Sequence, residues 1–234
     1  MDDLTIVYYT DGSLAPAFGA AQRRHLSESS ARAGAIPLIS VSQQPLAFGR
    51  NICIGPQPRA FRTIVHQIVT GLAAATTEYV ALCEHDTFYP PSHFDLRPPA
   101  GYDLVVNQHR HRAFPRDGRF CLFRGGRSMQ LIVGRRVVLL SDLAAKLKVL
   151  VADRDWHKRF EPGRGEADLN LPPVRCHIGA SAEPIIDIVN HGGNYSGRKR
   201  LGELSTDRLP DGRTMTDLIR AWSLPVTASK EERA

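Results

Sequence analysis

Strand-like and helix-like segments alternate along the first 84 residues of this chain, and this alternation restricts the fold more than any other feature of the sequence. Three short runs are rich in β-branched, aliphatic and aromatic residues, as strands are: 4–10, 36–42 and 78–83. The segments between them, 16–33 and 59–76, predict helices, the first by its Pro16 and Gly34 boundaries and the second by apolar residues at the helical period. This order indicates βαβ units, so the sequence predicts an α/β fold with a mixed, mainly parallel sheet flanked by helices.

Polar and charged residues follow each of the three predicted strands. They are Thr10-Asp11, Ser42-Gln43 and Glu84-His85-Asp86. Right-handed crossover connections bring the carboxyl ends of parallel strands to one edge of the sheet, which is where open α/β sheets bind their ligands. We therefore expect these groups to meet at a binding site.

The tripeptide Glu84-His85-Asp86 places two carboxylates at the end of a predicted buried strand. Like charges held together away from water repel each other and are costly to desolvate, so they need a compensating partner. Carboxylate oxygens suit Mn²⁺ or Mg²⁺, which proteins often hold through one or two carboxylates together with substrate phosphates. The tripeptide therefore indicates a metal site with Asp86 as the preferred direct ligand. A simpler interpretation is also open, in which Asp86 caps a turn and Glu84 ends an exposed strand.

The second half of the chain is less regular. Strands are predicted over 102–107, 119–123, 130–134 and 184–190, and a helix over 136–151. The glycine-rich loop FEPGRGEADLNLPP, which carries Glu161 and Glu166, lies between that helix and the last strand. Because no internal repeat or linker divides the chain, we expect residues 1–234 to form a single domain.

Charge and cysteine content bear on the partners and the compartment. Residues 104–136 contain eight arginines and one acidic residue, Asp117, so this segment is more positive than the whole chain, whose net charge is +6. The segment is either a solvated basic surface or a surface for a polyanion or a phosphate-bearing ligand. The four cysteines form no C-x-x-C pair, which favours reduced thiols in a cytoplasmic protein. No run reaches the roughly 18 apolar residues of a membrane span, so we expect none.

Three stretches resemble small bacterial and viral GT-A-like glycosyltransferases, enzymes with a Rossmann-like fold. In YVALCEHDTFYPPSHF, residues 79–94, a strand runs into EHD, an aromatic-proline segment and HF, as in that family. The piece IIDIVNHGGNYSGRK, residues 185–199, is similar to the family segment in which a histidine at a strand end is a further metal ligand. The N-terminal TIVYYTDGS is similar to the family's first nucleotide-binding strand.

The resemblance implies metal-dependent transfer of a sugar from a nucleotide-sugar donor, with UDP as the default nucleotide, to a hydroxyl acceptor. It assigns donor contacts to six residues: Thr10, Asp11, Arg59, Arg62, Asn194 and Arg198. It assigns the metal, Mn²⁺ or Mg²⁺, to Asp86 and His191, with Glu84 either a direct ligand or a supporting residue. Residues 1–100 would bind the nucleotide sugar, and 101–234 the acceptor. The tripeptide begins with Glu rather than Asp and has His in the middle, which leaves the ligand set open.

The catalytic base and the acceptor are less constrained. An inverting enzyme needs a carboxylate near the acceptor hydroxyl. The acids that follow the metal motif and could serve are Asp153, Asp155, Glu161, Glu166 and Asp187. Of these, Glu161 and Glu166 flank the turn EPGRGE and are our candidate catalytic residues. The arginines and phenylalanines of 104–136 are compatible with DNA that carries a hydroxymethylated base, while a glycan, lipid or protein acceptor is comparably open.

Three other interpretations compete with this one. A sugar-phosphate nucleotidylyltransferase needs a basic glycine-rich loop after the first strand, and DGSLAPAFGA has no basic residue. A metal-dependent phosphohydrolase would place its His-Asp pair on helices, whereas His85-Asp86 follows a predicted strand. A non-catalytic nucleic-acid-binding module would account for the basic segment but not for three strand ends that converge on carboxylates.

Overall fold

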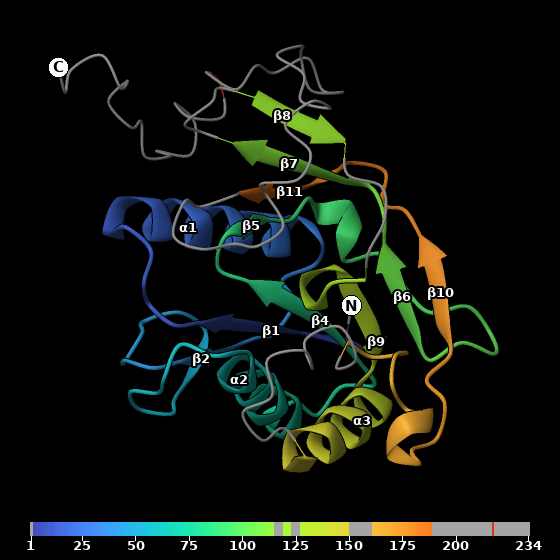
Figure 1. Ribbon diagram of the computed structural model, residues 1–234. Coiled ribbons are helices and arrows are strands. Elements are labelled where there is room, and N and C mark those ends of the chain that lie inside the picture. Colours follow the sequence, from blue (N-terminus) through green and yellow to red (C-terminus); the bar gives the residue numbers. More distant parts are fainter. Residues whose placement is uncertain (1, 115–118, 123–126, 150–160, 189–216, 218–234) are drawn as a thin grey trace, which may run out of the picture.

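The computed structural model describes residues 2–114, 119–122, 127–149, 161–188 and 217, and within these it contains two sheets (Figure 1). The larger sheet has seven strands in the order β10-β6-β9-β4-β1-β2-β3, and the smaller has four in the order β5-β11-β7-β8. The strands of the larger sheet are β1 (Leu4–Thr10), β2 (Leu38–Ser42), β3 (Arg50–Cys53), β4 (Tyr79–Glu84), β6 (Leu104–Asn107), β9 (Ile132–Arg135) and β10 (Cys176–Gly179). Those of the smaller sheet are β5 (Thr87–Phe88), β7 (Arg110–Phe114), β8 (Arg119–Leu122) and β11 (Ile185–Ile188). The described helices are α1 (Pro16–Arg32), α2 (Phe61–Ala74) and α3 (Arg136–Val149).

The first half of the chain follows the predicted βαβ pattern. β2, β1 and β4 are parallel neighbours in the larger sheet, and α1 and α2 are the connections between them. α1 lies on one face of this sheet, while α2 and α3 lie together on the other (Figure 1). β3 is a difference from the prediction, because the glycine and proline content of 43–58 predicts a loop there. The strand pairs with β2 at the edge of the sheet, where such neighbours are tolerated.

The second half contains the predicted strands but also others. β9 runs antiparallel between β4 and β6, which makes the larger sheet mixed and mainly parallel, as predicted. β7 was not predicted because its sequence, RHRAF, looks like a solvated basic segment. β10 was not predicted either, since CHIG is short and half-buried. Among the described residues, no helix has the length and apolar character needed to cross a membrane.

α2 packs on the sheet through a row of small and polar residues. Thr63, Gln67 and Gly71 recur every four residues and are buried, with β1 and β2 beneath them. A Cβ atom added to Gly71 would overlap Cγ1 of Val7 in β1 and would come within 3.3 Å of Cγ2 of Val41 in β2. The glycine therefore lets the helix backbone approach the strands more closely than any side chain would permit.

We predict that Gly71→Ala destabilises the protein by about 1–3 kcal/mol, because an overfilled contact forces the helix away from the sheet. At an exposed helical position the same change stabilises by about 0.5–1 kcal/mol, so the sign of the effect identifies its cause. Urea unfolding measures both variants, with Ala73→Gly at an exposed position of α2 as the control for helix propensity alone. A Gly71→Ala variant that is more stable than the unaltered protein would contradict the close packing.

A fully buried histidine connects the segment after β5 to the larger sheet. The ring of His93 packs against Tyr89 and Phe94, and its Nδ1 lies 3.1 Å from the side-chain amide nitrogen of Asn107 in β6. Burial lowers the pKa of His93 to about 3. The ring is therefore neutral in the folded protein, and Nδ1 accepts the hydrogen bond that Asn107 donates.

The pKa of His93 predicts a loss of stability in mild acid. The unfolded chain protonates this histidine near pH 6.5 and the folded chain near pH 3, so the unfolding free energy falls as the pH drops through that window. Between pH 7 and pH 5 the expected loss from this residue is about 2 kcal/mol. Urea unfolding at several pH values should show a shallower dependence for His93→Gln than for the unaltered protein. Equal slopes for the two would mean that His93 is not held neutral.

Candidate functional site

The carboxyl ends of β1 and β4 lie side by side and carry two of the predicted polar groups. Their parallel register pairs Tyr9 with Glu84. Thr10-Asp11 therefore leaves the sheet next to His85-Asp86, and this part of the predicted convergence is present in the structure. The positions follow from strand pairing alone, because each polar group comes directly after an apolar strand that has to lie in the core.

The smaller sheet brings a third carboxylate to the same place. β11 pairs antiparallel with β5, the two-residue strand that follows the tripeptide, and the register sets Asp187 opposite Thr87. The backbone amide of Ile188 donates a hydrogen bond of 2.9 Å to the carbonyl of Asp86. The site therefore lies where the two sheets join.

Two buried glutamines, one from each face of the larger sheet, hold the strand ends that carry the site. From α2, the side-chain amide of Gln67 donates to the carbonyl of Thr10 at 2.6 Å and to that of Val41 at 3.3 Å. From α1, the amide of Gln22 donates to the carbonyl of Thr87 at 2.9 Å. These bonds bring side-chain donors to buried carbonyls near the ends of β1, β2 and β5, and they fix the backbone from which the functional side chains project.

A polar cluster links the end of β1 to the tripeptide. Nδ1 of His85 lies 2.7 Å from Oγ1 of Thr10 and 3.6 Å from Oδ1 of Asp11. The Asp11 carboxylate also accepts bonds from the backbone amide and hydroxyl of Ser13, and it lies 3.5 Å from Nε of Arg59. Burial alone would raise the pKa of Asp11, but the Ser13 bonds and the nearby cations lower it on balance. Burial lowers the pKa of His85, against the opposing attraction of Asp11.

Repulsion and desolvation dominate the carboxylates on the other side of the tripeptide. Burial, followed by the charges of Asp187 and Asp11, raises the pKa of Glu84 to about 7. Burial, followed by the charges of Glu84 and Asp187, raises the pKa of Asp86 well above its usual range. Negative charge at this point is therefore costly unless a cation compensates it.

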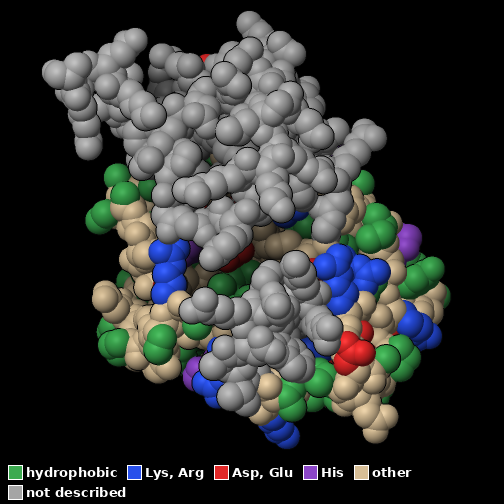
Figure 2. Space-filling model, viewed as in Figure 1, with side chains coloured by type: hydrophobic (Ala, Val, Ile, Leu, Met, Phe, Trp, Pro, Cys, Tyr) green, Lys and Arg blue, Asp and Glu red, His purple; other side chains and the backbone are tan. Residues whose placement is uncertain are grey.

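Two arginines from β7 supply part of that compensation. Nε of Arg112 donates to Oδ2 of Asp187 at 3.1 Å, and Nη1 of Arg110 lies 3.7 Å from the same oxygen. Only 2% of the Arg110 side chain is exposed, and burial lowers its pKa to about 10 even though Asp187 opposes that shift. Figure 2 shows acidic side chains near the centre of this face with Lys and Arg side chains on both sides.

The donor set at this edge fits a divalent cation. Glu84, Asp86 and Asp187 offer hard oxygen donors, and a cation would relieve the repulsion that raises the pKa of the first two. In the described part of the chain, no three acidic, histidine or cysteine side chains are already gathered as a metal-binding group. The predicted ligand His191 lies outside the described residues.

The two candidate catalytic glutamates differ in their surroundings. Glu161 forms an ion pair with Arg164 at 3.0 Å, and its negative charge partly opposes the lowering of the Arg110 pKa by burial. Glu166 accepts a bond of 2.6 Å from the fully buried Nζ of Lys146 and another of 2.7 Å from the amide of Gly163. These contacts give Glu166 a structural role in holding its loop on α3.

The remaining predicted donor contacts are dispersed or lie outside the described residues. Arg59 and Arg62 are exposed around the start of α2, and only Arg59 has a described contact at the site, its ion pair with Asp11. Asn194 and Arg198, like His191, are not among the described residues. Their assignments remain predictions.

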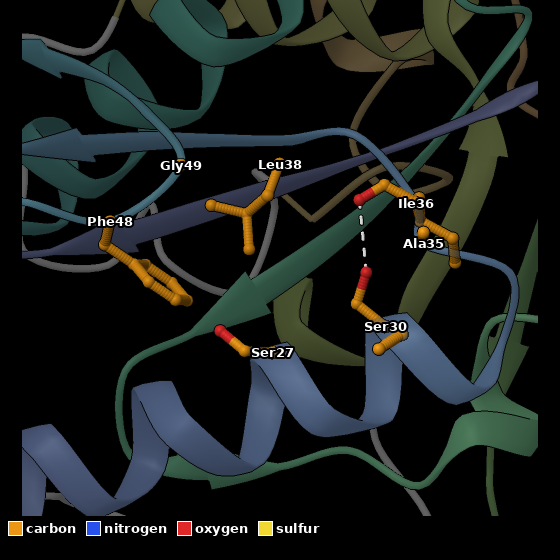
Figure 3. A pocket seen from close by; sticks show the side chains of 8 residues that line it. Ser27, Ser30, Ala35, Ile36, Leu38, Phe48 and Gly49 are labelled. Carbon is orange, nitrogen blue, oxygen red and sulfur yellow. Dashed lines mark hydrogen bonds between the residues drawn. The ribbon is translucent and has the colours of Figure 1, made fainter.

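A shallow pocket elsewhere is distinct from this site. It has a volume of about 270 Å³ and lies between α1 and the starts of β2 and β3, with Ser30, Ile36, Leu38 and Phe48 in its lining (Figure 3). The Ser30 hydroxyl donates to the carbonyl of Ile36 at 3.1 Å. The pocket is therefore at the amino-terminal edge of the strands, opposite the edge that carries the carboxylates.

Some residues that build the site were missed by sequence reasoning. Gln22 and Gln67 were not singled out, although each is a polar side chain on a helix face that packs on the sheet. Arg110 was read only as part of a basic segment. Its burial could have been anticipated only from the pairing of β7 with β11, which places it near Asp187 and which no local pattern predicts.

Comparison with known proteins identifies the fold. No family model matches the chain, and no curated protein matches it by sequence. Among solved structures, it is similar to S. aureus TarS 1-349 in complex with UDP-GlcNAc, with a TM-score of 0.51 and 9% identity. It is also similar to the mannosyltransferase PcManGT from Pyrobaculum calidifontis in complex with GDP-Man and Mn²⁺, with a TM-score of 0.50 and 13% identity.

Both likenesses cover 82% of this chain, which spans 60% of the TarS chain and 58% of the PcManGT chain. At such low identity they establish the fold. This chain has the mixed α/β fold of GT-A-type glycosyltransferases, as the resemblance in its sequence led us to expect.

We predict that Gln67→Met lowers the unfolding free energy by about 1–3 kcal/mol, because it keeps the side-chain shape but takes away the described donor to the buried carbonyl of Thr10 and a second, longer bond to the carbonyl of Val41. Chemical unfolding measures the loss. Gln57→Met is the matched control, since Gln57 is exposed and contributes only its backbone amide to a described bond. A Gln67 variant as stable as the control would contradict the role of this glutamine.

Proposed function

We propose that this protein is a metal-dependent glycosyltransferase that moves a sugar from a nucleotide sugar, with UDP as the default nucleotide, to a hydroxyl acceptor. The observation that carries the proposal is the meeting of Glu84, Asp86 and Asp187 beside Asp11 at the carboxyl edge of a GT-A-type fold. Nucleotide complexes of the structural neighbours support the choice of donor, since TarS was solved with UDP-GlcNAc and PcManGT with GDP-Man and Mn²⁺.

The proposal divides the work among the parts of the site. Thr10 and Asp11 bind the nucleoside, and Arg59 or Arg62 binds the diphosphate together with Asn194 and Arg198. Glu84 and Asp86 hold Mn²⁺ or Mg²⁺ with His191. A bound cation neutralises the charge that builds on the leaving nucleoside diphosphate. Residues 1–100 thus form the donor half and 101–234 the acceptor half.

For the catalytic base we propose Glu161, with Glu166 as the alternative. Both carboxylates are ion-paired, Glu161 with Arg164 and Glu166 with the fully buried Lys146. The Glu161 side chain is 18% exposed against 9% for Glu166, which supports the first assignment. A base must reach the acceptor hydroxyl, and the more exposed carboxylate is better suited to that.

The nature of the acceptor is less supported than that of the donor. Five arginines of 104–136 have described side chains, and each contacts another part of the chain: Arg110, Arg112, Arg127, Arg135 and Arg136. The carboxylates beside Arg110, Arg112 and Arg135 offset part of the charge that the segment can offer to a DNA backbone, whereas the described bonds of Arg127 and Arg136 go to uncharged acceptors. The proposal therefore keeps DNA with a hydroxymethylated base as one acceptor class beside glycans, lipids and proteins, and the same contacts weaken the alternative of a non-catalytic nucleic-acid-binding module.

The donor site is tested by calorimetric titration of UDP, GDP and their sugar conjugates, with Mn²⁺ and with EDTA. We expect one nucleotide to bind in the presence of Mn²⁺ and to lose roughly 10–100-fold in affinity with EDTA or in Asp86→Asn, because a cation held by the carboxylates would attract the negatively charged diphosphate.

Asp95→Asn is the matched control for this experiment, since Asp95 is an exposed aspartate nine residues further along the chain and should bind nucleotide like the unaltered protein. Absence of nucleotide binding under every condition would overturn the proposed function. Binding that neither EDTA nor Asp86→Asn affects would leave a nucleotide site but overturn the metal dependence.

A further inference from the structure

The imidazole of His85 lies against the end of β1, although its neighbours in sequence are the proposed metal ligands. Its Nδ1 is 2.7 Å from Oγ1 of Thr10 and 3.6 Å from Oδ1 of Asp11. Only 12% of the His85 side chain is exposed, so the ring is enclosed rather than free to turn in solvent. The side chain thus reaches the nucleoside end of the site, while its backbone belongs to the metal end.

We propose that His85 is a positioning residue that couples the metal end of the site to the nucleoside end, so that divalent metal and nucleotide strengthen each other's binding through the His85–Thr10 contact. This inference rests on the proposed function, because it takes the nucleotide to lie at Thr10 and Asp11. It concerns neither the metal ligands nor the nucleoside contacts themselves but the connection between them.

The surroundings of Thr10 and Asp11 favour this connection. The Thr10 carbonyl is held by Gln67, and its hydroxyl accepts a bond of 3.0 Å from the amide of Gly12. The Asp11 carboxylate is held on one side by the backbone amide and hydroxyl of Ser13. Among the described residues, His85 is the side chain that joins these fixed groups to the tripeptide.

The same contacts connect a change at Glu84 and Asp86 to the position of Thr10. His85 is bonded through the backbone to Glu84 and Asp86, so any adjustment of those carboxylates around a cation moves the atoms that carry the imidazole. Because the ring is enclosed and holds Oγ1 of Thr10 at hydrogen-bond distance, the adjustment reaches the groups proposed to contact the nucleoside. A nucleotide that stabilises one arrangement of Thr10 and Asp11 must favour the cation to the same extent, because coupling between two ligands is reciprocal.

The test is a calorimetric measurement of UDP and GDP binding with and without Mn²⁺ in three proteins: the unaltered chain, His85→Phe and His85→Asn. In the unaltered chain Mn²⁺ should increase affinity for the bound nucleotide. In His85→Phe, which keeps an aromatic ring but removes Nδ1, we expect the Mn²⁺-dependent enhancement to fall about tenfold while metal-free affinity changes little. His85→Asn places an amide near the position of Nδ1 and should restore most of the enhancement.

A double-mutant cycle separates the coupling from a general loss of structure. Thr10→Val removes the partner of His85 and should reduce the enhancement as His85→Phe does, while the double variant should be no worse than either single variant. His177→Phe is the control variant. His177 belongs to the edge strand β10, away from the site, and its ring packs against Tyr102. Thermal unfolding of each variant, measured in parallel, identifies any that do not fold, and if His85→Phe is one of them, the loss of enhancement in Thr10→Val carries the test.

The outcomes distinguish this inference from the function on which it rests. If the unaltered chain binds no nucleotide, the proposed function fails and the inference fails with it. If it binds nucleotide with Mn²⁺ but the enhancement is the same in His85→Phe, or if the two single effects add fully in the double variant, the proposed function stands and the coupling role of His85 is overturned. A reduced enhancement, restored by Asn and not additive with Thr10→Val, supports it.

Discussion

The site depends on the parallel pairing of β1 with β4. Because Tyr9 is opposite Glu84, the residues that follow each strand leave the sheet at the same level, and polar groups 75 residues apart in sequence come into hydrogen-bond contact. The pairing in turn depends on β1, which is buried along its whole length, and on β4, which is buried at its four central residues, and helices cover both strands on the two faces of the sheet. A slip of one register position would turn every core side chain of one strand to the opposite face.

Charge accumulates at this edge because the ends of β1 and β4 and the neighbouring strand β11 deliver carboxylates to it, and the structure balances that charge unequally. Asp187 has Arg110 and Arg112 beside it, whereas burial and repulsion raise the pKa of Glu84 and Asp86. Buried acidic side chains without a compensating charge are typical of functional sites, where a bound ligand can supply that charge. A cation bound as proposed would relieve this repulsion, so the imbalance that is costly for folding would favour its binding.

The first half of the fold could be predicted because its signals are local. Apolar runs, helical periodicity and the Pro16 and Gly34 boundaries each act over a few residues, and the carboxyl-edge rule then places Asp11 and Asp86 near each other. β7 and the approach of Asp187 could not be predicted in this way. They depend on the pairing of β11 with β7 and β5, which joins residues about 75 to 100 positions apart, and on buried Arg110, whose charge looks like a surface signal until its partner is known.

The position of Asp187 has a consequence for how such a site can change. Its strand belongs to the smaller sheet, whereas Glu84 ends a strand of the larger one, so the gap between the two carboxylates is set by the seam between the sheets. Ile186 and Phe88 are buried in the β11–β5 pair next to Asp187, so they help to fix the position of that strand. If the site holds a cation as proposed, resizing one of these hydrophobic side chains would shift Asp187 relative to Glu84 and alter the ion radius that the oxygens suit, with every acidic residue left in place.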